Sequence, residues 1–339
     1  MADPWAPLPR ASLAALPTPL HRLPRFSEAI GADVWIKRDD VGSLGLAGNK
    51  VRKLEFVLGA ARANGADVVV IVGAEQSNAA RAAAAACAQL DMRCVLVLSG
   101  DEPARPSGNL LLDHLFGAEV RFAGTKEWAA LAQFAEEVEA QLRREGATPY
   151  ALPAGASSPL GAIGFAVAWS ELLGQLDAAG VRPSAVIHAA SSGGTHAGLV
   201  AGRHLTGGGP RVRGILVADD IYPDMAGQYA ALAREAGRLL GADVPVTAGD
   251  LWLDDRFLGE GYAVPSPEAV EAIQLLARTE AVVCDPVYSG KALAALVASA
   301  RAGELDGPTV FWHTGGWHAL FAPRFSEAVL PCGPGAQRD

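Results

Sequence analysis

From about residue 50 onward, apolar segments of strand length alternate with amphipathic segments of helix length. Continuous apolar runs and alternation predict strands at 66–73, 93–100, 118–124, 185–190, 213–218, 281–285 and 309–316. Apolar residues at helical spacing predict helices at 50–64, 77–90, 109–117, 125–146, 163–175, 225–240 and 267–279, and two more that begin near 195 and 290. Strands that are apolar on both faces and separated by helices indicate a parallel sheet covered on both sides.

A stretch rich in Pro, Gly and Ser, LPAGASSPLGAIG at 152–164, interrupts this series. It is typical of a linker or of the wall of a cleft. We therefore expect two α/β lobes, each with an open, mostly parallel sheet. Folds of this kind bind ligands in the cleft at the carboxyl ends of their strands.

Composition and charge limit the kinds of molecule that this protein is expected to bind. The 339 residues allow two domains with cores of ordinary size, and a net charge of −9 argues against a nucleic-acid partner. No apolar run has the length of a membrane span and the first residues do not resemble a secretory signal, so we expect a cytoplasmic protein without a membrane partner. The four cysteines show no CxxC pairing, so we expect no metal and reduced thiols.

The segment GLAGNKVRKLEF, residues 45–56, places a lysine between a turn and a helix. Gly45, Gly48 and Asn49 suit a chain reversal, and Lys50 then begins an amphipathic helix. The positive end of the helix dipole would lower the pKa of this amine and favour a nucleophile. The alternative is a solvated helix start with several basic residues.

Two further strand-to-helix loops carry polar residues. Gln76, Ser77 and Asn78 either cap the following helix or hold a carboxylate or a ring oxygen. AASSGGTHAG at 189–198 has glycines that let backbone N–H groups approach an anion at a helix start, and its length suits one phosphate. The alternative for this second loop is an ordinary Gly-rich turn.

The last such loops are CDPVYSGKAL at 284–293 and HTGG at 313–316. Tyr288 is placed to face the cleft or to serve as a packing residue, and Thr314 ends the last strand at the same cleft. A lysine amine, a cradle for one phosphate, a Ser/Asn pair and a tyrosine are together the equipment for pyridoxal 5'-phosphate (PLP).

Several segments closely resemble the family of D-cysteine desulfhydrases and 1-aminocyclopropane-1-carboxylate (ACC) deaminases, over about residues 14–325. They are LPTPLHRL (16–23), WIKRDD (35–40), AGNKVRKLEF (47–56), QSN (76–78), LLDHLFGAEV (111–120), SSGGTHAGL (191–199) and DPVYSGKAL (285–293). The resemblance implies the tryptophan-synthase-β-like fold type II, with two open twisted sheets flanked by helices and PLP between two domains. It implies a large domain of residues 1–48 plus 162–339, a small domain of 49–161 inserted in it, and a homodimer.

Carried over position by position, the resemblance also implies roles. Lys50 would form the Schiff base with PLP and later carry a proton, Lys53 would contact the phosphate, and Asn78 would bind the ring hydroxyl. The residues expected to wrap the phosphate are Ser192, Gly193, Gly194 and Thr195, and the one expected at the pyridine nitrogen is Thr314. The substrate-binding residues expected are Gln76, Ser77, Asn78 and Tyr288, and those expected to be catalytic besides Lys50 are Ser77, Tyr288 and Tyr262.

The chain departs from the family pattern at positions that bear on the substrate. Ala47 stands where a glycine is usual, and Ala79 and Ala80 stand where the family usually has His and Thr after QSN. Ser289 follows Tyr288, whereas ACC deaminases have a glutamate there that can keep the ring nitrogen protonated. The stretch 218–224 fits no pattern.

These features predict a PLP-dependent lyase that eliminates a β-substituent from a small amino acid, with D-cysteine as the leading substrate. The alternatives are an ACC deaminase, an L-cysteate sulfo-lyase or a lyase of another β-substituted amino acid, and a homologue that binds PLP or an amino acid without turnover.

Overall fold

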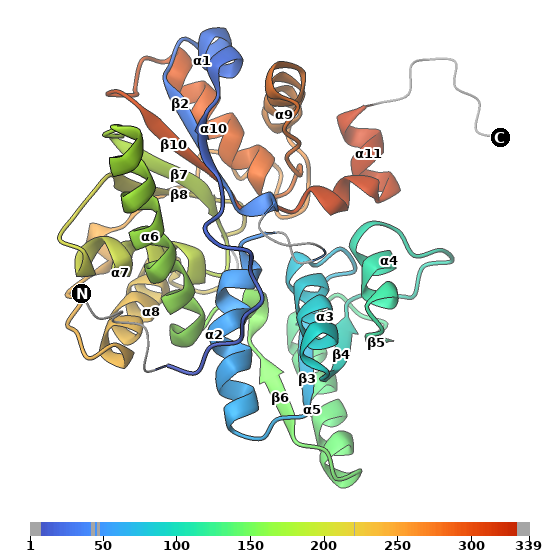
Figure 1. The fold of residues 1–339 in the computed structure, drawn as a ribbon. Coiled ribbons are helices and arrows are strands. Elements are labelled where there is room, and N and C mark those ends of the chain that lie inside the picture. The colour runs from blue at the N-terminus through green and yellow to red at the C-terminus, as the bar shows by residue number, and fades with distance from the viewer. Residues whose placement is uncertain (1–7, 42–44, 46–47, 220, 331–339) are drawn as a thin grey trace, which may run out of the picture.

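The computed structural model of the protein describes residues 8–41, 45, 48–219 and 221–330. Its strands form two separate β-sheets. The strands are β1 (Leu20–Arg22), β2 (Val34–Arg38), β3 (Val68–Gly73), β4 (Arg93–Leu98), β5 (Glu119–Phe122), β6 (Pro149–Leu152), β7 (Ala185–Ala190), β8 (Arg211–Leu216), β9 (Trp252–Asp254) and β10 (Thr309–His313). One sheet has six strands in the order β1-β2-β10-β7-β8-β9, and the other has four in the order β5-β4-β3-β6 (Figure 1). Every strand pair is parallel except β1 with β2.

Helices cover both sheets. They are α1 (Pro24–Ile30), α2 (Lys50–Ala63), α3 (Asn78–Leu90), α4 (Gly108–Leu115), α5 (Trp128–Arg144), α6 (Pro159–Ala179), α7 (Gly194–Leu205), α8 (Met225–Leu239), α9 (Pro267–Glu280), α10 (Ser289–Arg301) and α11 (Pro323–Val329). The 3-10 helices are η1 (Asp39–Val41), η2 (Ala154–Ala156), η3 (Ala248–Asp250) and η4 (Trp317–Phe321). None of the described helices is both long and apolar enough to cross a membrane.

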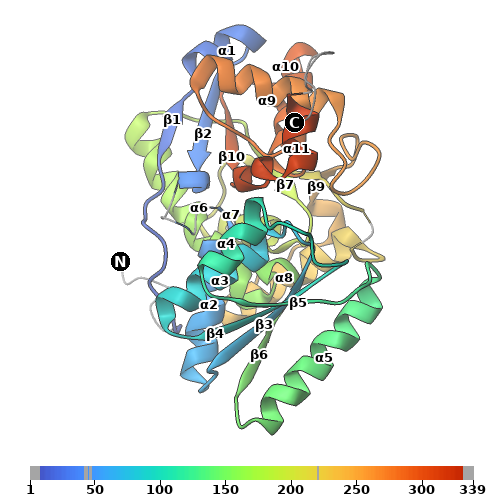
Figure 2. The same ribbon diagram turned by 90° about the vertical axis from the view of Figure 1, so that its right-hand side faces the viewer.

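The four-stranded sheet is buried on both faces, as its apolar runs predict. Val69 and Ile71 of β3 pack with the alanine-rich α3 and with α2, whereas Val68 and Val70 pack with α5 on the other face (Figure 2). The side chains of a strand point alternately to opposite faces, so a strand between two helical layers must be apolar at every position.

The six-stranded sheet is layered in the same way. Val186 of β7 and Trp312 of β10 pack with α6 on one face, and Ile187 and Phe311 pack with the α9–α10 side on the other. The fold is therefore the one that the sequence predicts: two mostly parallel sheets flanked by helices. The four-stranded sheet comes from 68–152, but the exact domain limits inferred from the resemblance stay a prediction.

One predicted strand is wrong. Residues 281–285 form no strand and instead connect α9 to α10 outside the six-stranded sheet. Val283 is also 41% exposed, unlike a strand residue buried on both faces. The stretch 152–164, predicted to be a linker or the wall of a cleft, contains the end of β6, η2 and the start of α6, and its residues Ala154 and Gly155 line the cavity described below. The sequence analysis missed the short strands β1, β2, β6 and β9 and the helices α1 and α11.

A buried network of charges anchors α2 to the six-stranded sheet. The Arg52 guanidinium donates to Asp39 at 2.9–3.0 Å and to Glu171 at 3.0–3.1 Å, and Lys37 also donates to Glu171. Burial alone would raise the pKa of Glu171, but its hydrogen bonds and ion pairs with Arg52 and Lys37 outweigh burial and lower the pKa to about 2. Because Arg52 is two residues after Lys50, this network fixes the start of α2.

Three of the four cysteines, Cys87, Cys94 and Cys284, are buried free thiols. Cys332 and the substituted position Ala47 lie outside the described residues.

Candidate active site

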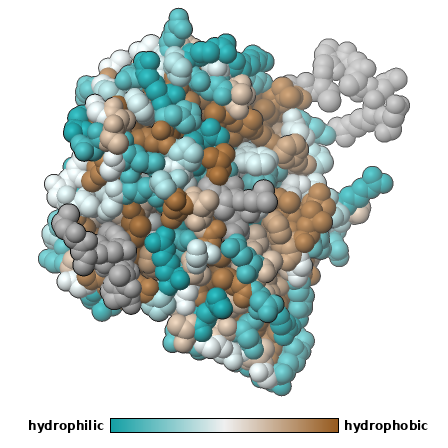
Figure 3. Space-filling model, in the orientation of Figure 1, coloured by the Kyte–Doolittle hydropathy of each residue, from teal (hydrophilic) through white to brown (hydrophobic). Residues whose placement is uncertain are grey.

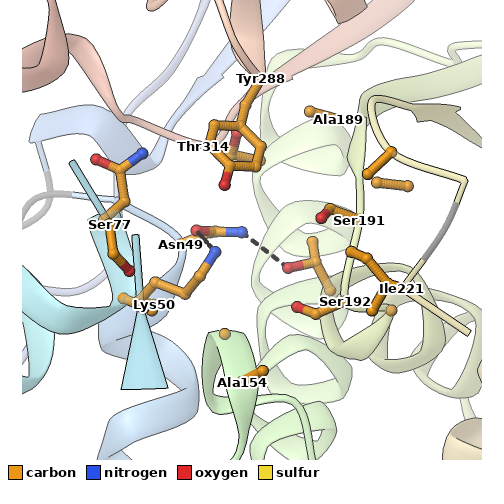
Figure 4. A pocket seen from close by; sticks show the side chains of 18 of the residues that line it. Asn49, Lys50, Ser77, Ala154, Ala189, Ser191, Ser192, Ile221, Tyr288 and Thr314 are labelled. Carbon is orange, nitrogen blue, oxygen red and sulfur yellow. Dashed lines mark hydrogen bonds between the residues drawn. The ribbon is translucent and has the colours of Figure 1, made fainter. Parts of the chain in front are cut away.

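A cavity of about 360 Å³ lies between the two lobes, at the carboxyl ends of β3, β7 and β10. Gly73 ends β3, Ala190 ends β7 and Thr314 follows β10, and all three line the cavity. Ten of the predicted site residues also line it: Lys50, Lys53, Ser77, Asn78, Ser192, Gly193, Thr195, Tyr262, Tyr288 and Thr314. Figure 4 shows Ser77 and Ser192 on opposite sides of Lys50.

Lys50 is the first residue of α2, as predicted, and its amine donates to Asn49 Oδ1 at 3.0 Å. Desolvation lowers the pKa of Lys50 to about 8, the Asp285 carboxylate opposes this shift, and the Arg81 charge adds to it. Burial is therefore the main cause of the lowered pKa, where the sequence analysis named the helix dipole. An amine with this pKa is partly unprotonated near neutral pH, which a nucleophile requires.

Lys53 lies one helical turn further along α2 and is only 1% exposed. Its amine donates to Ser157 Oγ at 3.0 Å and to the Gly155 carbonyl at 3.3 Å, which are both neutral. Desolvation, and then the nearby Lys50, lower the pKa of Lys53 well below its usual value. A buried amine surrounded by neutral acceptors is well suited to an anion that would complete its charge balance.

Donors from three chain segments converge on this point. Ser157 Oγ lies 2.8 Å from Ser192 Oγ and accepts from Gly194 N at 3.1 Å, at the first residue of α7. The segments approach so closely that a Cβ at Gly155 would lie 2.2 Å from Ser192 Oγ. Hydroxyls, an amine and a helix N-terminus at one end of the cavity fit a phosphate group. Gly194 contributes through Ser157 and does not itself line the cavity.

Asn49 joins the two helix starts that face the cavity. Its Nδ2 donates to Thr195 Oγ1 at 2.9 Å, while its Oδ1 accepts from Lys50 (Figure 4). The sequence analysis took Asn49 only as a turn residue. Its amide instead fixes Lys50 relative to Thr195, at the start of α7.

The start of α3 supplies the Ser/Asn pair. Ser77 is the N-cap of α3, since its Oγ accepts from Ala80 N at 3.2 Å, and it also lines the cavity. The capping interpretation is therefore confirmed, and the role of Ser77 in holding a carboxylate or a ring oxygen stays a prediction. Asn78 Oδ1 accepts from Asn109 Nδ2 at 2.8 Å, which fixes the orientation of the Asn78 amide.

Gln76, predicted to bind substrate, is not among the described residues that line the cavity. Its Oε1 accepts from Asn109 N at 2.8 Å and its Nε2 donates to the Ser107 carbonyl at 3.0 Å, so it supports the start of α4. Ala79 and Ala80, which stand where the family usually has His and Thr, differ from each other in where they lie. Ala79 lines the cavity, whereas Ala80 is fully buried in the core of the small sheet.

The two predicted tyrosines meet at the cavity. The hydroxyls of Tyr262 and Tyr288 are hydrogen-bonded to each other, and their rings are 5.9 Å apart at 71°. Burial, with a smaller contribution from Tyr262, raises the pKa of Tyr288 well above its usual value. Tyr288 therefore keeps its proton at neutral pH, and the shared hydrogen bond links its hydroxyl to that of Tyr262.

Ser289 does not face the cavity. Its hydroxyl donates to Asp285 Oδ1 at 2.6 Å, and the other carboxylate oxygen accepts from the N–H groups of Val287 and Tyr288. The residue that stands in place of the ACC deaminases' glutamate therefore supports the start of α10 and does not reach the cavity. Thr314 does line the cavity.

The unexplained stretch 218–224 also forms part of the site. Ala218, Ile221 and Tyr222 line the cavity, and Tyr222 Oη donates to the Ser192 carbonyl at 3.4 Å. The feature that could have indicated this role is that the stretch directly follows β8, which lies next to β7 in the sheet. Trp128 of α5 lines the cavity from the other lobe although it is 56% exposed, and nothing in its local sequence indicated this.

Comparison with known proteins agrees with this geometry. The family described as "Pyridoxal-phosphate dependent enzyme" matches residues 11–315. A relative from Pyrococcus horikoshii, provisionally named a 1-aminocyclopropane-1-carboxylate deaminase, is 41% identical over 316 residues, which cover 93% of this chain and 94% of the relative.

Solved structures agree in fold. The crystal structure of an ACC deaminase homologue matches with a TM-score of 0.88 and 39% identity, over 96% of this chain and 97% of that one. A threonine deaminase from T.th. matches with a TM-score of 0.61 and 23% identity, over 88% and 92% of the two chains, and shows similarity of fold alone. With a lysine amine, an anion site and a fold of type II, the chain belongs to the family of pyridoxal-phosphate-dependent enzymes, and its cofactor is PLP.

Proposed function

We propose that the protein is a PLP-dependent lyase that removes a β-substituent from a small amino acid, with D-cysteine as the leading substrate. The reaction converts D-cysteine and water to pyruvate, ammonia and hydrogen sulfide. The observation that carries the proposal is the pair of lysines on α2, with Lys50 at the centre of the cavity and Lys53 at the anion site.

PLP, when bound, supplies an electron sink for the negative charge that develops at the substrate's α carbon. In our proposal Lys53, Ser192, Gly193 and Thr195 hold its phosphate, and Ser157 positions the Lys53 amine and the Ser192 hydroxyl. The Lys50 amine attaches the cofactor and, once the substrate's own amine has replaced it, accepts the α proton. Its lowered pKa supports both tasks, because each requires the unprotonated amine.

The start of α3 is proposed to hold the substrate carboxylate. Ser77 and Asn78 lie at the N-terminus of this helix, where the dipole and the first N–H groups favour an anion. Tyr288, hydrogen-bonded to Tyr262, would donate a hydrogen bond to the leaving group, because its raised pKa keeps the phenol protonated.

The charges around the cavity favour β-elimination from an uncharged side chain. Among the described residues that line it, Lys50 and Lys53 are the cations and there is no carboxylate. The lining thus offers no anion to hold a proton on the cofactor's ring and no third cation for a sulfonate. Thr314 can donate a hydrogen bond but cannot balance a positive charge. This supports a thiol as leaving group over a ring opening or a cysteate.

ACC deamination is the second candidate, favoured by the provisional name of the Pyrococcus horikoshii relative and by the ACC deaminase homologue. Turnover with D-cysteine, β-chloro-D-alanine, L-cysteate and ACC separates the candidates. We expect pyruvate from the first two and little 2-oxobutanoate from ACC. Robust 2-oxobutanoate without pyruvate from any β-substituted alanine would assign the deaminase instead, and no turnover would indicate a binding protein.

We also propose a cytoplasmic homodimer, on the family resemblance. Exposed apolar side chains on one side of the molecule, around α4, η4 and α11, support an interface (Figure 3). They are Leu111, Leu115, Phe321 and Leu330. Sedimentation of the wild type and of Leu115→Glu tests this proposal, and a monomeric wild type would contradict it.

A further inference from the structure

Tyr262 reaches the active site from a segment without helix or strand. Residues 255–266 connect β9 to α9, and three of them have positive φ: Gly259 at +65°, Gly261 at +136° and Ala263 at +61°. Tyr262 itself is 37% exposed. A loop of this kind has no ladder of backbone hydrogen bonds to fix a side chain, yet the Tyr262 hydroxyl meets that of Tyr288.

Lys291 binds the backbone of this loop on either side of the turn that precedes Tyr262, while Phe257, Leu258 and Ala263 pack against the core. It belongs to the first turn of α10 and is 0% exposed. Its amine donates to the Leu258 carbonyl at 2.6 Å and to the Gly261 carbonyl at 2.8 Å. Gly261 is the residue before Tyr262, so the amine fixes the backbone directly beside the phenol.

The positions of both tyrosines therefore depend on the same helix, α10. Tyr288 is the N-cap of α10 and Lys291 is the third residue of that helix. The Tyr262 loop is held by Lys291, so a movement of α10 carries both phenols together. The distance between the two hydroxyls is then set by one rigid element and one pair of hydrogen bonds.

Stability alone does not explain a lysine at this position. The two acceptors of its amine are neutral carbonyls, and the Asp285 carboxylate acts on it only through its charge. Burial of an ammonium group costs free energy, and an apolar side chain of similar volume would fill the space without that cost. The loop therefore requires the N–H donors of the Lys291 amine rather than the volume of its side chain.

We propose that Lys291 is a positioning residue that holds Tyr262 against Tyr288 through the carbonyls of Leu258 and Gly261. The proposal rests on the proposed function, because it takes the two tyrosines as parts of the reaction site. Lys291 itself does not line the cavity, so its effect on the reaction must pass through Tyr262.

A double-mutant cycle on the holoenzyme tests this dependence, with kcat/KM for pyruvate release from D-cysteine as readout. Lys291→Met should lower kcat/KM about a hundredfold, the loss expected when a reacting group is displaced by about 1 Å. Once Tyr262→Phe has removed the phenol, adding Lys291→Met should cause little further loss. Losses that multiply in the double variant would overturn the proposal.

Lys37→Met provides the matched control, because Lys37 is also 0% exposed and also donates to a backbone carbonyl, that of Thr18 at 2.7 Å. Its effect should multiply with that of Tyr262→Phe. Hydrogen exchange of the holoenzyme gives a second readout that needs no turnover. Peptides from 255–266 should exchange several-fold faster in Lys291→Met, with protection restored in Lys291→Arg.

The two kinds of failure are distinguishable. If the wild type turns over none of the substrates, the proposed function fails. If Tyr262→Phe leaves kcat/KM unchanged, the role of Tyr262 in the reaction fails. In both cases the hydrogen-exchange experiment alone tests whether Lys291 positions the loop. If exchange at 255–266 is unchanged in Lys291→Met, the positioning claim itself is refuted.

Discussion

Replacement of Lys53 by methionine should change the stability of the apoprotein and its affinity for PLP in opposite directions. Without the cofactor, the Lys53 amine is 1% exposed and has neutral acceptors, and its pKa is well below the usual value. A lysine whose pKa falls on folding destabilises the folded state at every pH below its unfolded value of about 10.4. Lys53→Met removes this cost, so the apoprotein should unfold at a higher temperature at pH 7.

For PLP binding, the expected effect of Lys53→Met has the opposite sign, because the substitution removes a charged partner of the phosphate. A hydrogen bond to a charged group contributes about 1.5–3 kcal/mol, and about 1.4 kcal/mol corresponds to a tenfold change in Kd. The loss of Lys53 should therefore weaken PLP binding by about 10- to 150-fold. Thermal scans of the apoprotein and absorbance titrations with PLP measure the two effects. Ser157→Ala serves as control, because it removes a neutral partner of the same amine and leaves the charge.

The refuting result is equally definite. If Lys53→Met lowers the unfolding temperature of the apoprotein and leaves the Kd of PLP unchanged, Lys53 is a structural lysine and the phosphate lies elsewhere. A loss of both properties would mean that the hydrogen bonds to Ser157 and Gly155 outweigh the cost of burial.

Three further predictions concern the site and its support. Borohydride reduction of the holoenzyme followed by peptide mapping should place the pyridoxyl group on Lys50, and a label on any other lysine contradicts the assignment. Because the pKa of Glu171 is lowered to about 2, its contribution to stability should be complete above about pH 4.5 and should disappear as the pH falls toward 2. Urea midpoints of wild type and Glu171→Gln should therefore converge in this range, and a constant gap would refute the ion pair with Arg52. Ala79→His should change the substrate profile, whereas Ala80→Thr should chiefly destabilise the core by about 1–3 kcal/mol, and the reverse pattern in turnover and thermal scans would show that the cavity-facing residue was misassigned.

Sequence alone predicted what depends on local pattern. The apolar run of β3 gives a strand that is buried on both faces. The loops after β7 and β10 meet because these parallel neighbours share one sheet edge, and the loop after β3 reaches the same cavity from the other sheet. Lys50 was predicted in the correct place for the wrong main reason. The helix dipole can be read from the sequence, whereas the desolvation that lowers its pKa depends on the enclosing fold.

What the sequence did not indicate depends on contacts between distant residues. The strand β2 was missed, and the buried partner of its Lys37, Glu171, lies 134 positions away in the sequence. Ser157 was counted as part of a linker, although it meets Lys53 across 104 positions. Gln76 shares its polar character with Ser77, and only the structure shows that its amide is directed toward Ser107 rather than toward the cavity.

The Asn49–Thr195 and Lys53–Ser157 contacts join chain segments that meet only in the finished fold. PLP therefore recognises the native chain and has little to bind in an unfolded one. A ligand at a hundred times its Kd adds about 2.7 kcal/mol to the free energy of unfolding. The concentration of free PLP would thus govern how often the polypeptide unfolds and is exposed to proteolysis, as well as how much of it is catalytically competent.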